Sequence, residues 1–298
     1  MNPADLVAAK RRLRHSISVC LPARNEALTV GAVVGEVREQ LIDATGRWGG
    51  LVDEVVVIDD DSTDATAEVA AAAGARVVRQ ADVLAEAGPG SGKGNVLWKS
   101  LYVCVGDLLC WLDADLGNFR ADTVARLLEP LLSDVDTVLV KASYTRSFEG
   151  APTGGGRVTE LVARPLVSLL FPKLADIVQP LGGEYAARRE AVEVLPFVQG
   201  WGVELGLLVD VVERFGRDAV AQVDLGARVH RNRPVDELAA PSLAILATAL
   251  RRAGLMQFDG PTLELLRADL EGNIDAELVE IRERPPIATL PAYRVRHR

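Results

Sequence analysis

The sequence predicts an α/β fold in which a mostly parallel sheet carries helices on both faces. Short apolar, β-branched runs alternate along the chain with segments of helical periodicity, and several runs end directly in acidic residues. Hydrophobic residues make up 49% of the 298 residues and charged residues 25%, so the chain can bury a core and disorder is excluded as its dominant state. This length fits one large domain or two small ones that share a core.

The first half of the chain alternates regularly between the two kinds of element. The apolar runs that we expect to form buried strands are residues 17–23, 53–61, 75–80, 107–115 and 137–144. The segments with helical spacing are residues 25–40, 62–74, 95–104 and 120–133. Ser62 or Thr63 is expected to cap the second of these helices and Gly74 to end it.

The composition changes after about residue 145. Residues 145–160 read as a polar, glycine-rich loop that enters a helix, and residues 218–234 contain a further strand. The tail shows helical patterns over residues 243–252 and 263–272. We therefore divide the chain into three parts, residues 1–145, residues 146–240 and a helical extension over residues 241–298. The apolar tail helices either pack in a dimer or complete the core, and we expect a homodimer.

The net charge and the cysteine content bear on which partners the protein binds and in which compartment it acts. The net charge of −9 and the pI near 5.0 argue against a general nucleic-acid binder, although a few arginines and lysines can still hold a small anion. Cys20, Cys104 and Cys110 lie in apolar runs and are expected to be buried thiols, which points to the cytoplasm. No run approaches the ~20 apolar residues of a membrane span. The apolar run over residues 17–21 is too short for a signal peptide, so we expect no membrane partner.

Asp113 and Asp115 are the most informative pair of side chains. They are separated by one residue, Ala114, at the end of the apolar run 107–115. Paired carboxylates at a strand end suit Mg²⁺ or Mn²⁺, which takes few carboxylates and shares the rest of its shell with phosphate oxygens. An Asp-x-Asp triplet alone is a weak signal, because it also suits a solvated strand end or the cap of the following helix.

Two other segments of the first half carry possible ligand contacts. Residues 59–61 end the second strand, where acids can accept hydrogen bonds from a base or a ribose, or simply precede a capped helix. No G-x-G-x-x-G follows the first strand, so NAD binding is unlikely. Residues 88–94 form a glycine-rich loop that departs from the phosphate-loop pattern at two positions. We interpret it as a phosphate contact with Lys93 as the cation, the alternative being a plain linker.

The second half contains a candidate anion site. Gly155 and Gly156 precede Arg157 and Thr159 at the start of a helix, where backbone N–H groups, a guanidinium and a hydroxyl can hold a small dianion. The alternative is an ordinary loop with a solvated arginine. Glu204 lies between apolar residues and is either the buried partner of an arginine or a functional group. A lone histidine such as His230 is more often structural than a ligand.

These segments together resemble the GT-A glycosyltransferases, and most closely the glucosyl-3-phosphoglycerate synthases and their mannosyl relatives. The similar stretches run from about Leu21 to Pro234 and are LPARNEA, DDSTDAT, GSGKGN, WLDADL, GGGRVTELVARPL, QPLGGEYA, GWGVELGLLVD and AQVDLGARVHRNRP. Ala114 and the segment LGNF that follows Asp115 depart from the family's forms, which leaves the choice of donor open.

The resemblance implies a metal-dependent, retaining transfer of glucose from a nucleotide sugar, UDP-glucose first, to D-3-phosphoglycerate. It implies that Asp115 and His230 hold Mg²⁺ or Mn²⁺, and that Asp115, Glu204 and Arg157 are the catalytic residues. The donor-binding residues that we carry over are Pro22, Ala23, Arg24, Glu26, Asp60, Ser62, Lys93, Asp113, Ala114, Leu181 and Gly182. The acceptor-binding residues are Gly155, Gly156, Arg157, Thr159 and Asn232.

The reaction that the resemblance implies is a front-face transfer, in which the leaving phosphate takes the proton of the acceptor hydroxyl. Retaining hydrolases instead use a carboxylate nucleophile, and no residue of this sequence stands out as one. Three alternatives stay open at this point: a mannosyl-3-phosphoglycerate synthase that uses GDP-mannose, a sugar nucleotidyltransferase, and a nucleotide-sugar sensor without turnover.

Overall fold

The computed structural model describes residues 2–148, 151–228 and 234–297. Its centre is an eight-stranded sheet with the order β3-β2-β1-β4-β7-β5-β6, and β9 pairs with β5. The strands are β1 (Ile17–Ala23), β2 (Glu54–Asp59), β3 (Arg76–Arg79), β4 (Leu108–Trp111), β5 (Leu139–Phe148), β6 (Ala151–Gly154), β7 (Tyr185–Arg188) and β9 (Val220–Arg228). The pairs β1–β2, β1–β4, β2–β3 and β5–β9 are parallel, whereas β7 runs antiparallel to both of its neighbours.

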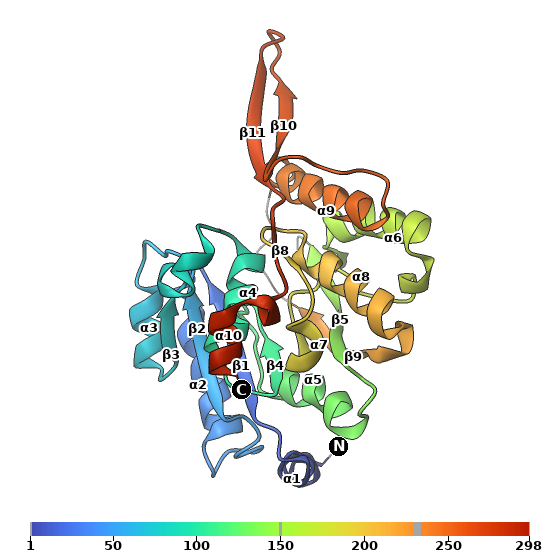
Figure 1. The fold of residues 1–298 in the computed structure, drawn as a ribbon. Helices are drawn as coiled ribbons and strands as arrows, with labels where there is room; N and C mark the ends of the chain where they lie inside the picture. Colours follow the sequence, from blue (N-terminus) through green and yellow to red (C-terminus); the bar gives the residue numbers. More distant parts are fainter. Residues whose placement is uncertain (1, 149–150, 229–233, 298) are drawn as a thin grey trace.

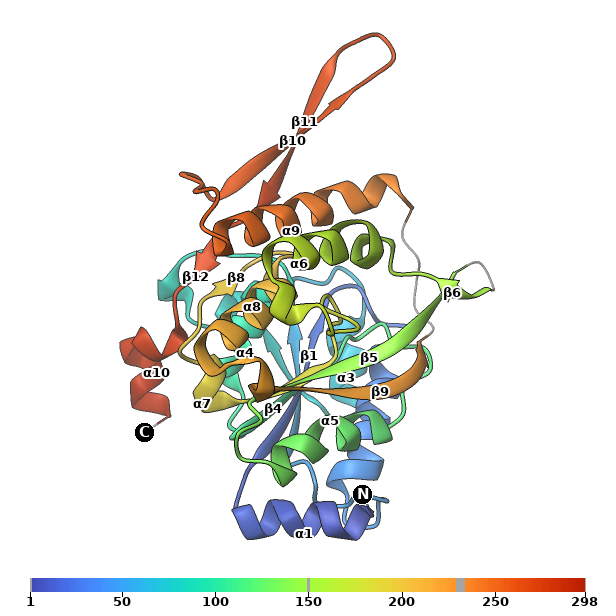
Figure 2. The same ribbon diagram turned by 90° about the vertical axis from the view of Figure 1, so that its right-hand side faces the viewer.

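Helices cover both faces of this sheet, which confirms the predicted fold class (Figures 1 and 2). One face carries α1 (Pro3–Leu13), α2 (Val30–Val37) and α5 (Asp122–Ser133), whose apolar residues share one core with Ile17, Val19 and Leu21 of β1. The other face carries α4 (Lys93–Val103), α6 (Arg164–Leu170) and α8 (Val203–Phe215), in a second core with Cys20. Successive residues of β1 therefore enter opposite cores, as expected of a strand buried on both faces.

The remaining helices and short strands complete the chain. They are α3 (Thr66–Ala72), α7 (Arg189–Val192), α9 (Ala239–Arg252), α10 (Pro291–Arg296), β8 (Phe197–Val198), β10 (Thr262–Ala268), β11 (Ile274–Glu280) and β12 (Glu283–Arg284). No helix of the described chain combines the length and the apolar composition that crossing a bilayer requires. Cys20, Cys104 and Cys110 are buried free thiols, as predicted.

Two predicted helices begin later than the sequence pattern indicates. The helix expected from residue 25 begins at Val30, because Asn25 takes a left-handed backbone conformation with φ 58°. The helix expected from residue 62 begins at Thr66, and the Asp64 carboxylate accepts a hydrogen bond from its backbone N–H at 3.0 Å. Neither Ser62 nor Thr63 caps that helix, although Gly74 follows its end with φ 94°, as expected.

The structure also differs from the prediction in the second half. The expected loop over residues 145–160 contains the end of β5 and the short strand β6. Residues 263–272, expected to be helical, belong to the β10–β11 hairpin, which projects away from the body of the molecule (Figure 1). A turn at Asp269–Asn273 makes this hairpin, because the Asp269 carboxylate accepts from the Asn273 backbone and Gly272 supplies φ 83°.

Candidate active site

A cavity of about 610 Å³ opens at the carboxyl ends of β1, β2 and β4, the edge where α/β sheets bind ligands. Most of the predicted site residues that the structure describes line it. The lining residues among them are Pro22, Ala23, Arg24, Glu26, Asp60, Lys93, Asp113, Ala114, Asp115, Gly156, Arg157, Thr159, Leu181 and Glu204. Gly155 and Gly182 are sequence neighbours of lining residues, and Ser62 contacts the turn between Arg24 and Glu26, but none of the three lines the cavity itself. His230 and Asn232 lie outside the described residues.

The ends of β1 and β2 form one wall of the cavity. The backbone N–H of Asp60 donates to the carbonyl of Ala23 at 2.8 Å, which fixes the two strand ends together. The Arg24 guanidinium reaches over the Asp60 carboxylate at 3.9 Å. Burial raises the pKa of the Asp60 carboxyl above its ordinary value, and Arg24 opposes that shift. This wall offers one partly buried acceptor and one exposed cation to a polar ligand.

Ser62 stabilises the turn that follows β1 in this wall. Its hydroxyl oxygen accepts a hydrogen bond from the backbone N–H of Asn25 at 3.0 Å, and the Asn25 amide oxygen accepts from Thr63 at 2.8 Å. The paired turns hold Arg24 and Glu26 at the cavity. Ser62 therefore stabilises the strand-end loop in the structure.

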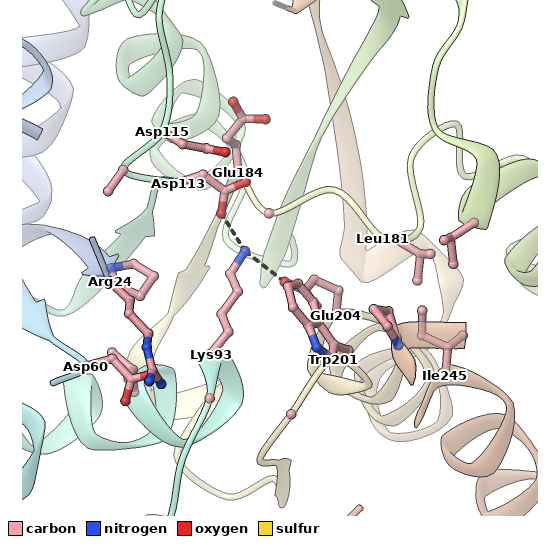
Figure 3. A pocket seen from close by; sticks show the side chains of 18 of the residues that line it. Arg24, Asp60, Lys93, Asp113, Asp115, Leu181, Glu184, Trp201, Glu204 and Ile245 are labelled. Carbon is pink, nitrogen blue, oxygen red and sulfur yellow. Dashed lines mark hydrogen bonds and ion pairs between the residues drawn. The ribbon is translucent and has the colours of Figure 1, made fainter. Parts of the chain in front are cut away.

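Lys93 lies at the centre of the cavity, between two carboxylates. Its Nζ is 2.5 Å from Asp113 and 2.9 Å from Glu204 (Figure 3). Burial alone would lower the pKa of the Lys93 ammonium, but the two carboxylates raise it well above its ordinary value. A side chain at Gly183 would place its Cβ 2.3 Å from both Lys93 Nζ and Asp113 Oδ2, so any other residue there would displace this ion pair. Lys93 is therefore a permanent cation held between the strand end and helix α8.

A second lysine, Lys141 on β5, lies behind the wall and is 2% exposed. Its ammonium donates to the carbonyl of Gly182 and lies 4.5 Å from the centre of the Tyr185 ring. Burial lowers the pKa of Lys141 to about 8. Lys141 was not among the predicted site residues, although a charged residue inside the apolar run 137–144 was a usable signal. Lys141 holds the turn that carries Leu181 and Gly183 to the cavity.

Asp115 lies beyond the end of β4. Asp113 and Glu184 lie toward the same end of the cavity (Figure 3). Carboxylate oxygens are the ligands that Mg²⁺ and Mn²⁺ prefer, so the donor set fits a divalent cation. Within the ranges 2–148, 151–228 and 234–297, no three His, Cys, Asp or Glu side chains are grouped to hold a metal by themselves. The arrangement fits an ion that takes further ligands from a bound phosphate.

The opposite wall is built from helical segments. Gly156, with φ 75°, turns the chain so that Arg157, Val158 and Thr159 face the cavity just before α6. Thr159 is buried, and the backbone N–H of Glu160 donates to the Gly156 carbonyl at 3.0 Å. This wall presents a guanidinium, a hydroxyl and a glycine turn to the cavity, and its use as an anion site stays a prediction.

Several lining residues were not among the predicted site residues. Trp201, 42% exposed, presents an indole beside Glu204. The start of α9 supplies Leu238, Pro241 and Ile245, from a region for which the sequence offered no motif. Apolar residues of a helix give no local sign that they face a cavity rather than a core.

Comparisons with known proteins agree with this geometry. The model of glycosyl transferase family 2 matches residues 18–193. Glucosyl-3-phosphoglycerate synthase from Mycolicibacterium smegmatis is 47% identical over 292 residues, which cover 96% of this chain and 93% of that protein.

Solved structures extend the similarity to the fold. Glucosyl-3-phosphoglycerate synthase from Mycobacterium tuberculosis, in complex with Mn²⁺, UDP-glucose and phosphoglyceric acid, is 44% identical with a TM-score of 0.85. The match covers 97% of this chain and 95% of that chain. The same enzyme in complex with Mg²⁺ and UDP is 43% identical with a TM-score of 0.85 and the same coverage.

Proposed function

We propose how the residues of this chain, which belongs to glycosyltransferase family 2 and within it to the glucosyl-3-phosphoglycerate synthases, carry out the reaction. The reaction is the transfer of glucose from UDP-glucose to D-3-phosphoglycerate. The observation that carries the proposal is the two-sided cavity. Carboxylates and Lys93 lie at the strand ends, and Arg157 and Thr159 lie on the facing wall. One cavity therefore offers a diphosphate site and a separate anion site.

The donor occupies the strand-end wall. Asp60 accepts hydrogen bonds from the nucleoside, and Arg24 and Lys93 face its diphosphate. The full donor set is Pro22, Ala23, Arg24, Glu26, Asp60, Ser62, Lys93, Asp113, Ala114, Leu181 and Gly182. Ser62 acts through the Asn25 backbone that it holds, and Gly182 through the turn that Lys141 holds. Asp115 and His230 would hold Mg²⁺ or Mn²⁺, and the bound ion would neutralise charge that develops on the leaving diphosphate.

The acceptor occupies the facing wall. Arg157 pairs with the phosphate or carboxylate of phosphoglycerate through two N–H groups, and the Thr159 hydroxyl and the backbone N–H groups of the glycine turn add neutral donors. The acceptor set is Gly155, Gly156, Arg157, Thr159 and Asn232. This wall fixes the acceptor so that its free hydroxyl faces the sugar.

The transfer retains the configuration of the sugar. The bond between the anomeric carbon and the diphosphate oxygen breaks, and the bond to the acceptor hydroxyl oxygen forms on the same face. The hydroxyl proton passes to the leaving phosphate oxygen. Glu204 keeps Lys93 charged and in place beside the reacting groups, since its carboxylate is 2.9 Å from Nζ. Asp115, Glu204 and Arg157 are accordingly the residues that the transfer needs most.

The three predicted parts of the chain take separate roles in this proposal. Residues 1–145 bind the nucleotide sugar, residues 146–240 bind the acceptor, and residues 241–298 close and support the cavity. The enzyme acts in the cytoplasm, where its buried free thiols remain reduced.

A homodimer forms through the β10–β11 hairpin. Strand alternation puts Leu266, Ala268, Ile274, Ala276 and Leu278 on one face, and the leucines and Ile274 are 59–67% exposed. An isolated two-stranded hairpin is only marginally stable in water, so a second copy that covers this face supplies the missing packing. Light scattering on a sizing column tests this. We expect a dimer mass that falls to the monomer mass in Leu266→Glu/Leu278→Glu, and a monomer in the unsubstituted protein would contradict it.

A donor-by-acceptor assay tests the transfer. Protein with Mg²⁺ or Mn²⁺ is given UDP-glucose, GDP-glucose or GDP-mannose, each with and without D-3-phosphoglycerate, and release of nucleoside diphosphate is recorded. We expect release with UDP-glucose that depends on phosphoglycerate and disappears in Asp115→Ala. Release only with GDP-mannose would make the chain a mannosyl transferase. Release without acceptor dependence would remove phosphoglycerate as the acceptor.

A further inference from the structure

The tail of the chain returns to the body of the molecule as the short strand β12, which pairs with β8. Arg284 of β12 lies opposite Phe197 of β8 in an antiparallel pair, and the backbone N–H of Gln199 donates to the Arg282 carbonyl at 2.9 Å. Arg284 is 4% exposed and does not line the cavity. Its side chain nevertheless reaches the segment just before α4, and that segment lines the cavity with Ser91 and Gly92.

The Arg284 guanidinium makes two hydrogen bonds to that segment and a third to the first turn of α4. Its Nε donates to the Asn95 side-chain oxygen at 2.9 Å, and its two terminal nitrogens donate to the carbonyls of Ala87 at 2.7 Å and Gly88 at 3.0 Å. The guanidinium also lies 5.1 Å from the centre of the Trp98 ring. All three acceptors are neutral. The buried cation therefore makes its hydrogen bonds to the segment before α4 and to the first turn of α4.

The loop over residues 88–92 fits tightly against this cation. A side chain at Gly90 would place its Cβ 2.2 Å from an Arg284 terminal nitrogen and 2.5 Å from the Gln199 side-chain oxygen. Gly88 and Gly92 have φ 79° and 78°, so the loop can follow this path only with glycine at those positions. Gln199 adds two hydrogen bonds. Its side-chain oxygen accepts from the Ser91 N–H at 3.3 Å, and its carbonyl accepts from the Asn95 N–H at 3.0 Å.

The other side of the same loop faces the donor. Ser91, Gly92 and Lys93 line the cavity, and Lys93 is the first residue of α4. A loop that moved away from Arg284 would carry Lys93 away from Asp113 and Glu204. We propose that Arg284, together with Gln199, is a positioning residue for the nucleotide sugar, because it fixes the loop that places Lys93; the proposal rests on the proposed function.

Arg189 provides a matched control at the other end of α4. It is also buried, and its guanidinium donates to the carbonyls of Gly106 at 2.7 Å and Cys104 at 2.9 Å, with a further bond to Leu101. These carbonyls lie at and beyond the end of α4 and do not line the cavity. Arg284 and Arg189 therefore make similar hydrogen bonds, and only Arg284 acts on a cavity segment.

The experiment compares Arg284→Lys with Arg189→Lys in the full-length protein. A lysine keeps the charge but reaches only one of the three acceptors. We expect Arg284→Lys to raise the KM for UDP-glucose at least about tenfold and to leave the KM for D-3-phosphoglycerate within about twofold. Arg189→Lys should lower the melting temperature without a selective change in either KM. Equal effects of the two variants on both KM values would overturn the proposal.

Hydrogen exchange measured without ligand separates this proposal from the proposed function. We expect the Ser91 and Asn95 amides to exchange at least about tenfold faster in Arg284→Lys and to be unchanged in Arg189→Lys. If the unsubstituted protein does not turn over UDP-glucose, the proposed function fails while this exchange result still decides whether Arg284 fixes the loop. If Arg284→Lys does not fold, Gln199→Leu carries the test, and an unchanged KM for UDP-glucose in that variant would overturn the proposal.

Discussion

The two walls of the cavity are built in different ways. The strand-end wall comes from neighbouring parallel strands: its arginine and its carboxylates follow β1, β2 or β4, and Lys93 joins them from the start of α4. The facing wall is assembled from separate segments: the glycine turn before α6, the start of α8 and the start of α9. Backbone hydrogen bonds between strands fix the first wall, whereas packing of helices places the second.

This difference indicates which part of the site can change its substrate specificity. A sheet edge holds its residues in a fixed register, so it suits the diphosphate and the metal, whose geometry is shared by many donors. Loops and helix starts can change without disturbing the sheet, so they suit the part of the site that recognises the acceptor.

The largest expected effect is on the strand-end wall. Asp115→Asn keeps the shape of the side chain but removes the charge that the metal needs, so we expect kcat/KM to fall at least about 10³-fold, or ~4 kcal/mol. Asp107→Asn, at the opposite end of β4, is the control, because Asp107 accepts hydrogen bonds from Ser16 away from the cavity. Steady-state kinetics on both variants measure this. A similar loss in the two would show that Asp115 matters only for folding.

The contact between the two walls gives the next largest effect. Glu204→Gln keeps an oxygen that can accept from Lys93 but removes one of the two charges that hold it, and we expect kcat to fall about 10²-fold. Asp210→Asn is the matched control, since Asp210 lies on the same helix and pairs with Arg252 at 2.6 Å away from the cavity. If Glu204→Gln retains full kcat, the contact does not serve the reaction.

The two buried lysines, Lys93 and Lys141, differ in pKa, so they affect the pH dependence of the free energy of unfolding differently. Burial lowers the pKa of Lys141 to about 8, because its direct contacts are a carbonyl and a ring. The nearby carboxylates of Glu204, Asp113 and Glu184 raise this pKa and Lys93 lowers it, and their combined effect only partly offsets burial. Between pH 8 and the ordinary lysine pKa of 10.5, the unfolded chain binds a proton that the folded chain has lost, so the free energy of unfolding rises with pH. Lys93, whose pKa is raised, keeps its proton in the folded chain over this pH range and so does not change the free energy of unfolding there.

Urea unfolding at pH 8 and pH 9.5 measures this contribution of Lys141. We expect the unsubstituted protein to gain about 1–2 kcal/mol relative to Lys141→Met over this interval. Lys173→Met, at an exposed site, should show no such difference. A constant difference between the unsubstituted protein and Lys141→Met at both pH values would mean that Lys141 stays charged in the fold.

The smallest expected effect concerns the support of the strand-end wall. Ser62→Ala removes one acceptor for the Asn25 N–H, but Thr63 and Glu26 keep their hydrogen bonds to the paired turns. We expect the KM for UDP-glucose to change less than about twofold, as measured by initial rates. A change of tenfold or more would mean that the Ser62 hydroxyl contacts the donor itself.

The strand-end wall was largely predictable from sequence. Apolar runs such as residues 53–61 end in acids, and parallel strands bring those ends to one edge, so the closeness of Asp60 and Asp113 follows from local pattern and topology. The antiparallel strand β7 was not predicted, because residues 185–188 form too short a run to be distinguished from a loop.

The tail was predicted least well. Residues 263–272 fit a helical pattern as well as an alternating one, and the choice is made by the turn at Asp269–Asn273 with its left-handed Gly272. The contacts of Arg284 with Ala87, Gly88 and Asn95 join residues nearly 200 positions apart, and no local pattern encodes them.

The most direct test of the two-sided cavity compares one arginine from each wall. Arg24 lies on the strand-end wall beside Asp60, and Arg157 lies on the facing wall. The measurement is the KM for UDP-glucose and the KM for D-3-phosphoglycerate in Arg24→Ala and in Arg157→Ala. The two-sided cavity predicts opposite selectivity: Arg24→Ala raises mainly the first KM, and Arg157→Ala raises mainly the second, each about tenfold. If both variants raise the same KM, the walls do not divide the substrates and the assignment is wrong.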